Sequence, residues 1–316
     1  MAARCADRQK AEKVNIGLSA IATTPERRLT LQFALLVLIW STSFLWIKIL
    51  VAEIPPGWLA VSRLVLGACV LSVAALLNQH GKEANIEAGL PWRVILVAAL
   101  LGNALPYTLI HAGEVTVDSG VAAVLIGTMP LATFVCAWLI LGERLSSMQL
   151  GGLALGFVGL IVLIGTDALA GLGQTWGQLL VIGGSVCYAL SATLVRKLGS
   201  SRSIMVAALT LWLAAACVTP FAFLESPNPV FPQSGQTWIA LLILGALCTG
   251  GAAWLYFQLL GQVPANKFAQ INYIIPLLGY LWGLIFMGET LRWQAVLAAA
   301  MIIVGVRAVL RNRPLQ

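Results

Sequence analysis

The chain has 316 residues, of which 59% are hydrophobic and 10% charged, and its net charge is +7. Soluble domains have about 45–50% apolar and about 25% charged residues, so this composition excludes an ordinary soluble domain and indicates a membrane protein. Because the Lys and Arg residues are spread between hydrophobic segments and the chain ends, they predict membrane orientation and no binding of nucleic acid.

Residues 1–29 are polar and mixed in charge. Segments of this composition cannot bury enough apolar surface to fold, so we expect a disordered cytoplasmic tail. An apolar core of about 7–15 residues, as in a cleavable secretory signal, is absent before Leu31.

Ten apolar stretches follow, and each approaches the length of about 20 residues that a spanning helix needs. They predict an all-α membrane protein with ten transmembrane helices. The expected spans are Leu31–Leu50, Trp58–Leu77, Arg93–Ile110, Gly120–Leu141, Met148–Gly165, Gln178–Leu198, Ile204–Leu224, Ile239–Leu260, Ala265–Met287 and Trp293–Val309.

The distribution of Lys and Arg predicts that both termini lie in the cytoplasm. With the N-terminus inside, the cytoplasmic connections and C-terminus contain Lys82, Arg93, Arg144, Arg196, Lys197, Arg202, Lys267, Arg307, Arg311 and Arg313, whereas the external segments contain only Lys48 and Arg292. Five helices per half is an odd number, so the second half is expected to run inverted. We expect the two repeats at residues 30–166 and 177–310.

One loop signature occurs twice. Pro130 precedes Gly142-Glu143-Arg144-Leu145, and Pro276 precedes Gly288-Glu289-Thr290-Leu291; each proline lies 12 residues before its glycine, and the copies are 146 residues apart. Gly159 and Gly305 keep the same interval. At an offset of 148, Trp40, Ser43 and Lys48 align with Tyr188, Ser191 and Arg196. Such duplication is typical of secondary transporters, which bind substrate between the repeats.

Charged side chains inside a bilayer are functional candidates, since each costs about 2.5–3.5 kcal/mol on insertion scales. Arg63, about two turns into the second span, could bind a substrate carboxylate, or it could be a structural residue that extends to the outer boundary or binds the carbonyls at a helix C-terminus. His111 with Glu114 and Asp118 could titrate for proton coupling, but we favour a water-solvated interfacial cluster. Glu143 and Glu289 are expected to cap the start of the next helix.

Uncharged polar and aromatic residues supply the other substrate-binding candidates. Buried amides and hydroxyls must face protein or a wet cavity in a membrane, and aromatic rings could stack on substrate. Lipid contact and core packing explain any single aromatic equally well. The expected substrate-binding set is Trp40, Ser43, Arg63, Tyr107, Tyr188, Ser191, Gln270 and Tyr273.

Prolines and glycines predict hinges and close helix packing. Pro130 and Pro276 should kink the fourth and ninth spans at equivalent points, which makes them candidate hinges. Gly152, Gly156 and Gly159 in the fifth span, and Ala298 and Gly305 in the tenth, form small-residue faces that allow close approach. No His/Cys cluster or CxxC motif occurs, so we expect no metal site and no cofactor.

These features resemble the drug/metabolite transporter superfamily, and within it the EamA-type permeases of ten helices. The likeness rests on Trp40-Ser41-Thr42-Ser43-Phe44, on Arg63 after Pro55-Pro56, and on the two loop signatures, and it covers about residues 30–310. The resemblance implies transport through a central cavity among helices 1–4 and 6–9, with helices 5 and 10 as supports. Within this superfamily, the chain also resembles the exporters of aromatic amino acids.

The sequence therefore predicts a secondary transporter of the inner membrane that exports small metabolites, with amino acids favoured and other metabolites or drugs as the alternative. A membrane enzyme lacks paired catalytic residues here, a helper subunit would not need the inverted repeat, and no phosphate-binding GxxxxGK[ST] loop is present. An absence of buried acids favours facilitated movement or loose proton coupling. Both a monomer and a dimer fit the sequence.

Overall fold

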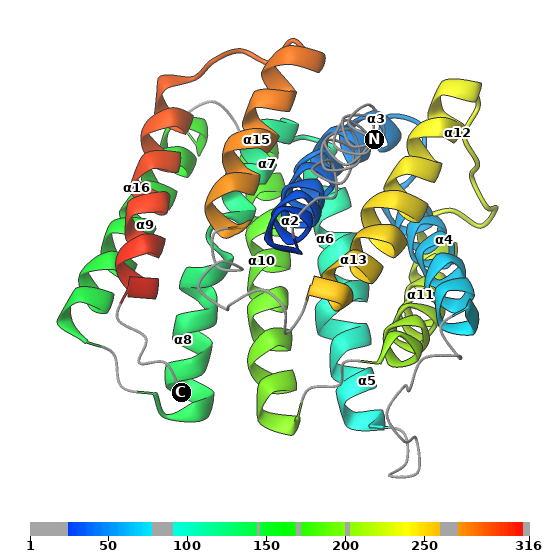
Figure 1. The fold of residues 1–316 in the computed structure, drawn as a ribbon. Helices are drawn as coiled ribbons and strands as arrows, with labels where there is room; N and C mark the ends of the chain where they lie inside the picture. The colour runs from blue at the N-terminus through cyan, green and yellow to red at the C-terminus, as the bar shows by residue number, and fades with distance from the viewer. Residues whose placement is uncertain are drawn as a thin grey trace, which may run out of the picture.

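The structure is a computed structural model that describes residues 25–77, 91–143, 146–168, 172–199, 203–259 and 271–311. Within these ranges the regular structure is helical and contains no strand. Seven helices are long and apolar enough to cross a membrane, and three shorter apolar helices are Ser147–Gly159, Ile274–Phe286 and Trp293–Ala308. The described helices therefore confirm the predicted fold of ten membrane helices (Figure 1).

The first half supplies five spans, of which three are interrupted. In chain order they are α2 (Pro25–Ser41) with α3 (Ser43–Leu50), α4 (Pro56–Leu77), α5 (Trp92–Ala99) with the π-helix η3 (Leu100–Ala104) and α6 (Leu105–Glu114), α7 (Ser119–Ile126) with α8 (Met129–Leu141), and α9 (Ser147–Ala168).

The second half repeats this order. Its spans are α10 (Leu172–Leu198), α11 (Ile204–Glu225), α12 (Gly235–Leu242) with the π-helix η4 (Ile243–Gly251) and α13 (Ala252–Leu259), α15 (Ile271–Phe286), and α16 (Trp293–Arg311). The predicted start of the ninth span at Ala265 lies outside the described residues.

Several helices begin or end beyond their predicted limits. Helix α2 begins at Pro25, within the tail expected to be disordered to residue 29. Proline suits a first helical turn because its missing N–H would have no partner there. The third span continues to Glu114, four residues past its predicted end, and α10 starts six residues early at Leu172. The rest of the tail, residues 1–24, lies outside the described residues.

The two loop signatures form the same helix ending at opposite ends of the bundle. Gly142 and Gly288 have φ angles of 68° and 64°, which glycine adopts without the steric cost of a side chain. The Glu143 N–H donates to the Ala137 carbonyl at 3.4 Å, and the Glu289 N–H donates to the equivalent Gly283 carbonyl at 3.3 Å. Each bond reaches back six positions, and together with the left-handed glycine it satisfies a carbonyl at the end of the helix. We call the two sides of the bundle the Gly142 end and the Gly288 end.

The α8–α9 turn lies at the bottom of Figure 1 and the α15–α16 turn at the top, so the second half is inverted relative to the first. Equivalent helices of the two halves pack together, α4 against α11, α9 against α16, and α7 against α15. This arrangement confirms the predicted inverted repeat.

The predicted small-residue faces form the contact between α9 and α16. A Cβ atom added to Gly305 would lie 2.4 Å from the Gly152 carbonyl oxygen, and one added to Gly159 would lie 3.1 Å from the Ala298 carbonyl oxygen. Real Cβ contacts are longer, so only glycine allows these backbones to approach this closely. Helices α9 and α16 are held by close backbone packing, as the sequence predicted.

The two predicted hinges differ in their local structure. Pro276 lies inside α15, as expected, whereas Pro130 lies in the first turn of α8 because Gly127 and Thr128 already interrupt the fourth span. Proline is tolerated in a first turn, so at Pro130 the span is broken and not simply kinked. Pro276 lies against the interruption of the fourth span, since a Cβ atom on Gly127 would lie 2.8 Å from Pro276 Cγ.

Candidate functional site

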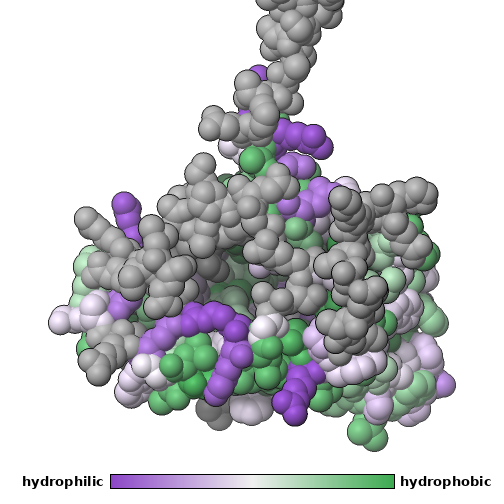
Figure 2. All heavy atoms as spheres, turned by 60° about the horizontal axis from the view of Figure 1, so that its bottom comes forward, coloured by the Kyte–Doolittle hydropathy of each residue, from purple (hydrophilic) through white to green (hydrophobic). Residues whose placement is uncertain are grey.

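A cavity of about 210 Å³ lies between helices of both halves, toward the Gly142 end. Val94, Val195 and Val206 contribute to its wall, and all three lie near the ends of their helices on that side. Figure 2 looks onto this end, where the described surface is hollowed near its middle and hydrophilic side chains gather at its front edge. Most of the lining is apolar, and its polar side chains are Asn103, Tyr107, Thr210 and Thr249.

Arg63 lies directly behind two of these polar residues. Its Nε donates to Thr249 Oγ1 at 2.8 Å, and its guanidinium carbon lies 4.0 Å from the centre of the Tyr107 ring. The side chain is 6% exposed, which excludes the predicted alternative in which Arg63 extends to the membrane boundary. A cation on an aromatic face with a hydroxyl acceptor is a stabilised way to hold a guanidinium at membrane depth.

The proton position on His111 follows from its partners. Arg63 Nη1 lies 3.3 Å from His111 Nε2, and because a guanidinium only donates, Nε2 must be the acceptor. The proton is therefore on Nδ1, which lies 3.4 Å from the Pro56 carbonyl oxygen. His111 is thus a neutral side chain that orients Arg63.

Tyr107, His111 and Glu114 follow one another along one face of α6, at intervals of four and three residues. The Tyr107 and His111 rings stack with centroids 6.2 Å apart. His111 and Glu114 are each 0% exposed, so the expected water-solvated cluster is wrong for these two residues. The sequence interpretation failed because it ended the helix at Ile110, whereas the helix continues and turns both side chains into the protein.

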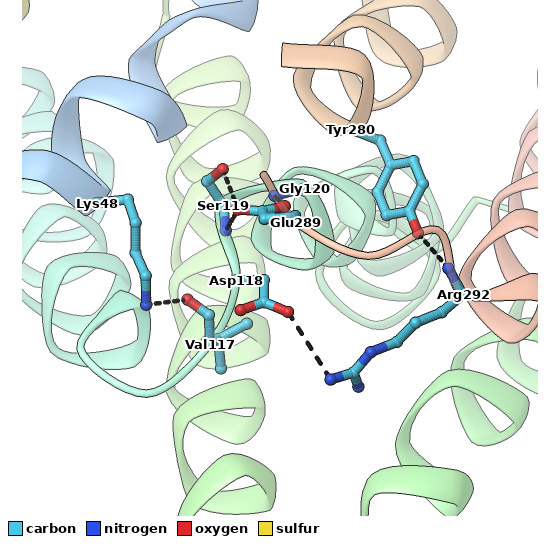
Figure 3. A network of polar contacts seen from close by, with 8 residues as sticks. All are labelled: Lys48, Val117, Asp118, Ser119, Gly120, Tyr280, Glu289 and Arg292. Carbon is cyan, nitrogen blue, oxygen red and sulfur yellow. Dashed lines mark hydrogen bonds and ion pairs between the residues drawn. The ribbon is translucent and has the colours of Figure 1, made fainter. Parts of the chain in front are cut away.

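The Gly288 end is joined by a network of polar contacts (Figure 3). Lys48 Nζ of α3 donates to the carbonyl oxygens of Glu114 and Val117 at 2.8 and 2.9 Å. The side chain of Arg292 lies 3.8 Å from Asp118, and its backbone N–H donates to the Tyr280 hydroxyl at 3.0 Å.

Glu289 is the centre of this network. Its carboxylate accepts from the Ser119 N–H at 2.7 Å, the Ser119 hydroxyl at 2.6 Å and the Gly120 N–H at 3.0 Å. It therefore caps α7 of the other half and not the following helix α16, which corrects the prediction. A carboxylate at a helix N-terminus satisfies unpaired donors and complements the helix dipole, so Glu289 ties the two halves together at this end. Its counterpart Glu143 pairs with Arg196 instead.

The other predicted substrate-binding residues separate into groups. Tyr188 meets Tyr107 edge to face with centroids 6.5 Å apart, and Ser191 lies against η3, where a Cβ atom on Gly102 would be 2.7 Å from its hydroxyl. Trp40 pairs instead with Tyr256 at 5.8 Å. Ser43 is 7% exposed, and its hydroxyl has no hydrogen bond within the described part of the chain. Gln270 lies outside the described residues, as does the side chain of Tyr273.

Asn103 and Thr249 line the cavity within η3 and η4. Sequence reasoning placed Asn103 among the polar residues that must face protein or a wet cavity but left it out of the substrate-binding set, and it missed Thr249. Asn103 Nδ2 donates to the Ala98 carbonyl at 2.8 Å, and Thr249 Oγ1 donates to the Leu244 carbonyl at 2.9 Å, each five residues back. The two residues are themselves 146 positions apart, which was the available signal. Wide turns of π type leave such carbonyls accessible and occur often at functional sites.

Comparisons with known proteins agree with this architecture. The model of the EamA-like transporter family matches residues 29–165 and 175–311. The transporter YvbV of Bacillus subtilis is 29% identical over 281 residues, which covers 89% of this chain and 90% of YvbV. The inner membrane transporter YedA of Escherichia coli is 28% identical over 86% of this chain and 87% of its own length, and PagO of Salmonella typhimurium is 26% identical over 90% and 94%.

A solved crystal structure with 20% sequence identity shares the fold, with a TM-score of 0.62 over 91% of this chain and 99% of the other. Both halves of the described bundle thus correspond to known architecture, and both family matches fall on the two inverted halves. The chain is a multi-pass membrane protein that belongs to the EamA-like transporter family.

Proposed function

We propose that the protein is a secondary transporter that exports small organic metabolites, most readily amino acids, across the inner membrane. The observation that carries this proposal is the cavity between the two inverted halves, with the buried guanidinium of Arg63 behind its polar wall. The name of the relative YedA, an inner membrane transporter, supports the location.

The chemistry of the cavity favours a small amphipathic substrate with one carboxylate. Its wall is mostly apolar, and a single buried cation stands behind Tyr107 and Thr249. The two hydrogen bonds to Thr249 and His111 engage two of the five N–H groups of the guanidinium, which leaves donors for a carboxylate. A polyanion would need several such cations. Amino acids with apolar side chains match this combination.

The proposed cycle is alternating access between the repeats. The Lys and Arg distribution assigns the Gly142 end to the cytoplasm, so this conformation offers its cavity to the cytoplasm while Glu289, Lys48 and Arg292 close the external side. Pro130 and Pro276 act as hinges where the fourth and ninth spans meet, beside Gly127. Closure of the Gly142 end and opening of the Gly288 end would then carry substrate outward.

The apolar lining also supports the alternative of a drug or another metabolite as substrate. The rings of Tyr107 and Tyr188, and those of Trp40 and Tyr256, would stack on aromatic compounds whether or not they carry a carboxylate. The two substrate classes differ in whether they require Arg63, since only a substrate with a carboxylate would pair with the guanidinium.

Transport of labelled phenylalanine and of its decarboxylated analogue phenethylamine into proteoliposomes separates the two substrate classes. We expect saturable flux of phenylalanine and little flux of phenethylamine, because the amine alone cannot pair with Arg63. Equal flux of both compounds would support the amphipathic-drug alternative. No flux of either compound, with no flux of any member of a wider amino-acid panel, would contradict amino-acid export.

A further inference from the structure

Two glutamates at the Gly288 end have opposite surroundings. The carboxylate of Glu289 accepts three hydrogen bonds, at 2.7, 2.6 and 3.0 Å. Glu114, at the end of α6, is 0% exposed, and neither of its carboxyl oxygens has a hydrogen-bond partner among the described residues. The export cycle proposed above gives Glu114 no role, so the burial of this carboxyl group needs a separate explanation.

Burial without donors opposes the ionised form of Glu114. An ion transferred from water to a nonpolar interior without partners loses far more free energy than a neutral acid does. The nearest cations attract a negative charge on Glu114, but neither donates a hydrogen bond to its carboxyl group: Lys48 of α3 donates to two backbone carbonyls, and Arg63 of α4 donates to Thr249 and His111. We therefore expect Glu114 to carry a proton in this conformation.

The other charged and titratable groups around Glu114 leave this conclusion in place. His111, one turn earlier on α6, is neutral by its hydrogen bonds. Glu289, on the loop before α16, uses both carboxyl oxygens to accept hydrogen bonds at the α7 N-terminus and offers Glu114 no donor. Asp118 precedes α7 with its side chain 38% exposed and faces Arg292. Helix α10, which packs on α6, carries its described charges, Arg196 and Lys197, at the opposite end.

We propose that Glu114 is the proton-binding residue of a proton-coupled transport cycle. This inference rests on the proposed transport function. The face of α6 that carries Tyr107, His111 and Glu114 runs from the cavity to the Gly288 end, a rise of about 10 Å for seven residues. Glu114 thus lies between the two regions that alternating access opens in turn.

The exchange step is a simple acid dissociation. When Glu289 leaves the α7 N-terminus and Lys48 leaves the α6 and α7 carbonyls, water reaches Glu114. The carboxyl O–H bond then breaks, a water oxygen accepts the proton, and the hydrated carboxylate gains Lys48 as a counter-ion. Closure removes that water with the carboxylate paired to Lys48, and Glu114 takes up the next proton from the Gly142 side, along the face of α6 that carries His111 and Tyr107, once the cavity there is open. Each cycle therefore transfers one proton across the membrane.

The test compares wild type with Glu114→Gln and Glu114→Asp in proteoliposomes with labelled phenylalanine. A pH gradient should drive accumulation in the wild type, by up to about tenfold per pH unit for one proton. Glu114→Gln, which mimics the protonated side chain, should keep phenylalanine exchange at equal pH and lose the response to the gradient. Glu114→Asp, which keeps a carboxyl group, should keep part of the response to the pH gradient. Glu53→Gln, an exposed glutamate at the same end, is the matched control and should behave as wild type.

A second measurement requires no substrate. Infrared difference spectra of the protein in lipid, recorded during a pH change, should contain carbonyl bands of protonated carboxylic acids, and Glu114→Gln should lose one component of the wild-type bands. Retained exchange in Glu114→Gln shows that the variant folds. Gradient-driven accumulation in Glu114→Gln, or carbonyl bands identical to those of the wild type, would overturn the proposal. Failure of the wild type to transport any amino acid would instead contradict the proposed function, and the infrared band would then decide the protonation of Glu114.

Discussion

At the residue scale, the site depends on how one buried guanidinium is held. Arg63 is fixed by a hydroxyl from η4, an imidazole from α6 and the face of Tyr107. Thr249 is the residue that links these contacts to the cavity, because its hydroxyl both accepts from Arg63 and donates to the Leu244 carbonyl. Each half of the protein thus supplies a part of the same polar cluster.

Replacement of Thr249 by valine should destabilise the protein. The variant keeps the shape of the side chain but leaves Arg63 Nε without its acceptor, and an unsatisfied buried donor costs about 1–3 kcal/mol. Thermal unfolding in detergent should show a lower apparent Tm. Thr219→Val is the control, because the Thr219 hydroxyl bonds only to the Ala215 carbonyl of its own helix. Equal melting of the two variants would contradict the role given to Thr249.

The sequence identified Arg63 and Tyr107 because charge and aromatic residues in apolar spans are conspicuous. It named Asn103 only among the polar residues that must face protein or a wet cavity, and it did not name Thr249, since a threonine in a helix is ordinary until the π-type turns bring it beside a distant side chain. His111 and Glu114 were found as a pair but placed in water. Their burial depends on where the helix ends and on which elements cover it, and neither is a local property of the sequence.

At the scale of elements, the repeated Gly-Glu turn performs two different tasks. The glycines end equivalent helices with the same backbone geometry, whereas Glu289 caps α7 and Glu143 pairs with Arg196. Sequence spacing predicted the turns, because left-handed glycine and a helix ending are local features. The partner of each glutamate lies more than 50 residues away in the chain, so the turn alone could not reveal it.

Replacement of Glu289 by glutamine should loosen the Gly288 end. The amide keeps an acceptor but removes the charge at the N-terminus of α7, which costs up to about 2 kcal/mol. Amide hydrogen exchange of α7 in nanodiscs should accelerate by a factor of about 5–30 for a loss of 1–2 kcal/mol. The exposed residue Glu53 provides the control variant Glu53→Gln. Unchanged exchange in α7 would show that Glu289 does not hold this end.

The contact between α9 and α16 is a second property of elements. Gly305→Ala places a Cβ atom against the Gly152 carbonyl, and such overpacking typically costs about 1–3 kcal/mol. Gly151→Ala is the matched control, because a Cβ atom there meets nothing within 4 Å. We expect a lower apparent Tm only for Gly305→Ala. Similar melting of both variants would mean that the close approach of these helices contributes little.

Hinge motion at the prolines also belongs to this scale. Pro130→Ala and Pro276→Ala should each slow phenylalanine transport more than they weaken its binding, since Pro276→Ala restores a helical hydrogen bond inside α15 and Pro130→Ala removes the fixed φ angle from the first turn of α8. Initial rates and equilibrium binding of phenylalanine in the same preparations separate the two effects. Full transport by both variants would count against the hinges.

At the scale of the whole molecule, the inverted repeat was predictable from the sequence. Equivalent residues recur at equal intervals, and each half contains an odd number of spans. Prolines predicted interruptions of the third, fourth and ninth spans, but the sequence did not predict those at Thr42 and within η4, nor that the fourth span breaks at Gly127–Thr128 ahead of Pro130. They arise where helices of the two halves meet and where carbonyls find side-chain partners. Of these, η3 and η4 contribute Asn103 and Thr249 to the cavity wall, and Gly127 lies beside the proposed hinge Pro276.

The most direct test of the account is counterflow of labelled phenylalanine in proteoliposomes that contain the Arg63→Lys variant. The control is Arg93→Lys, a change at an exposed residue. Lysine keeps the positive charge but cannot bind a carboxylate with two parallel N–H groups or keep the stacking on Tyr107. We expect Arg63→Lys to raise the KM for phenylalanine by about tenfold, a loss of about 1.4 kcal/mol, while Arg93→Lys leaves it unchanged. An unchanged KM in Arg63→Lys would contradict a substrate site built around this guanidinium.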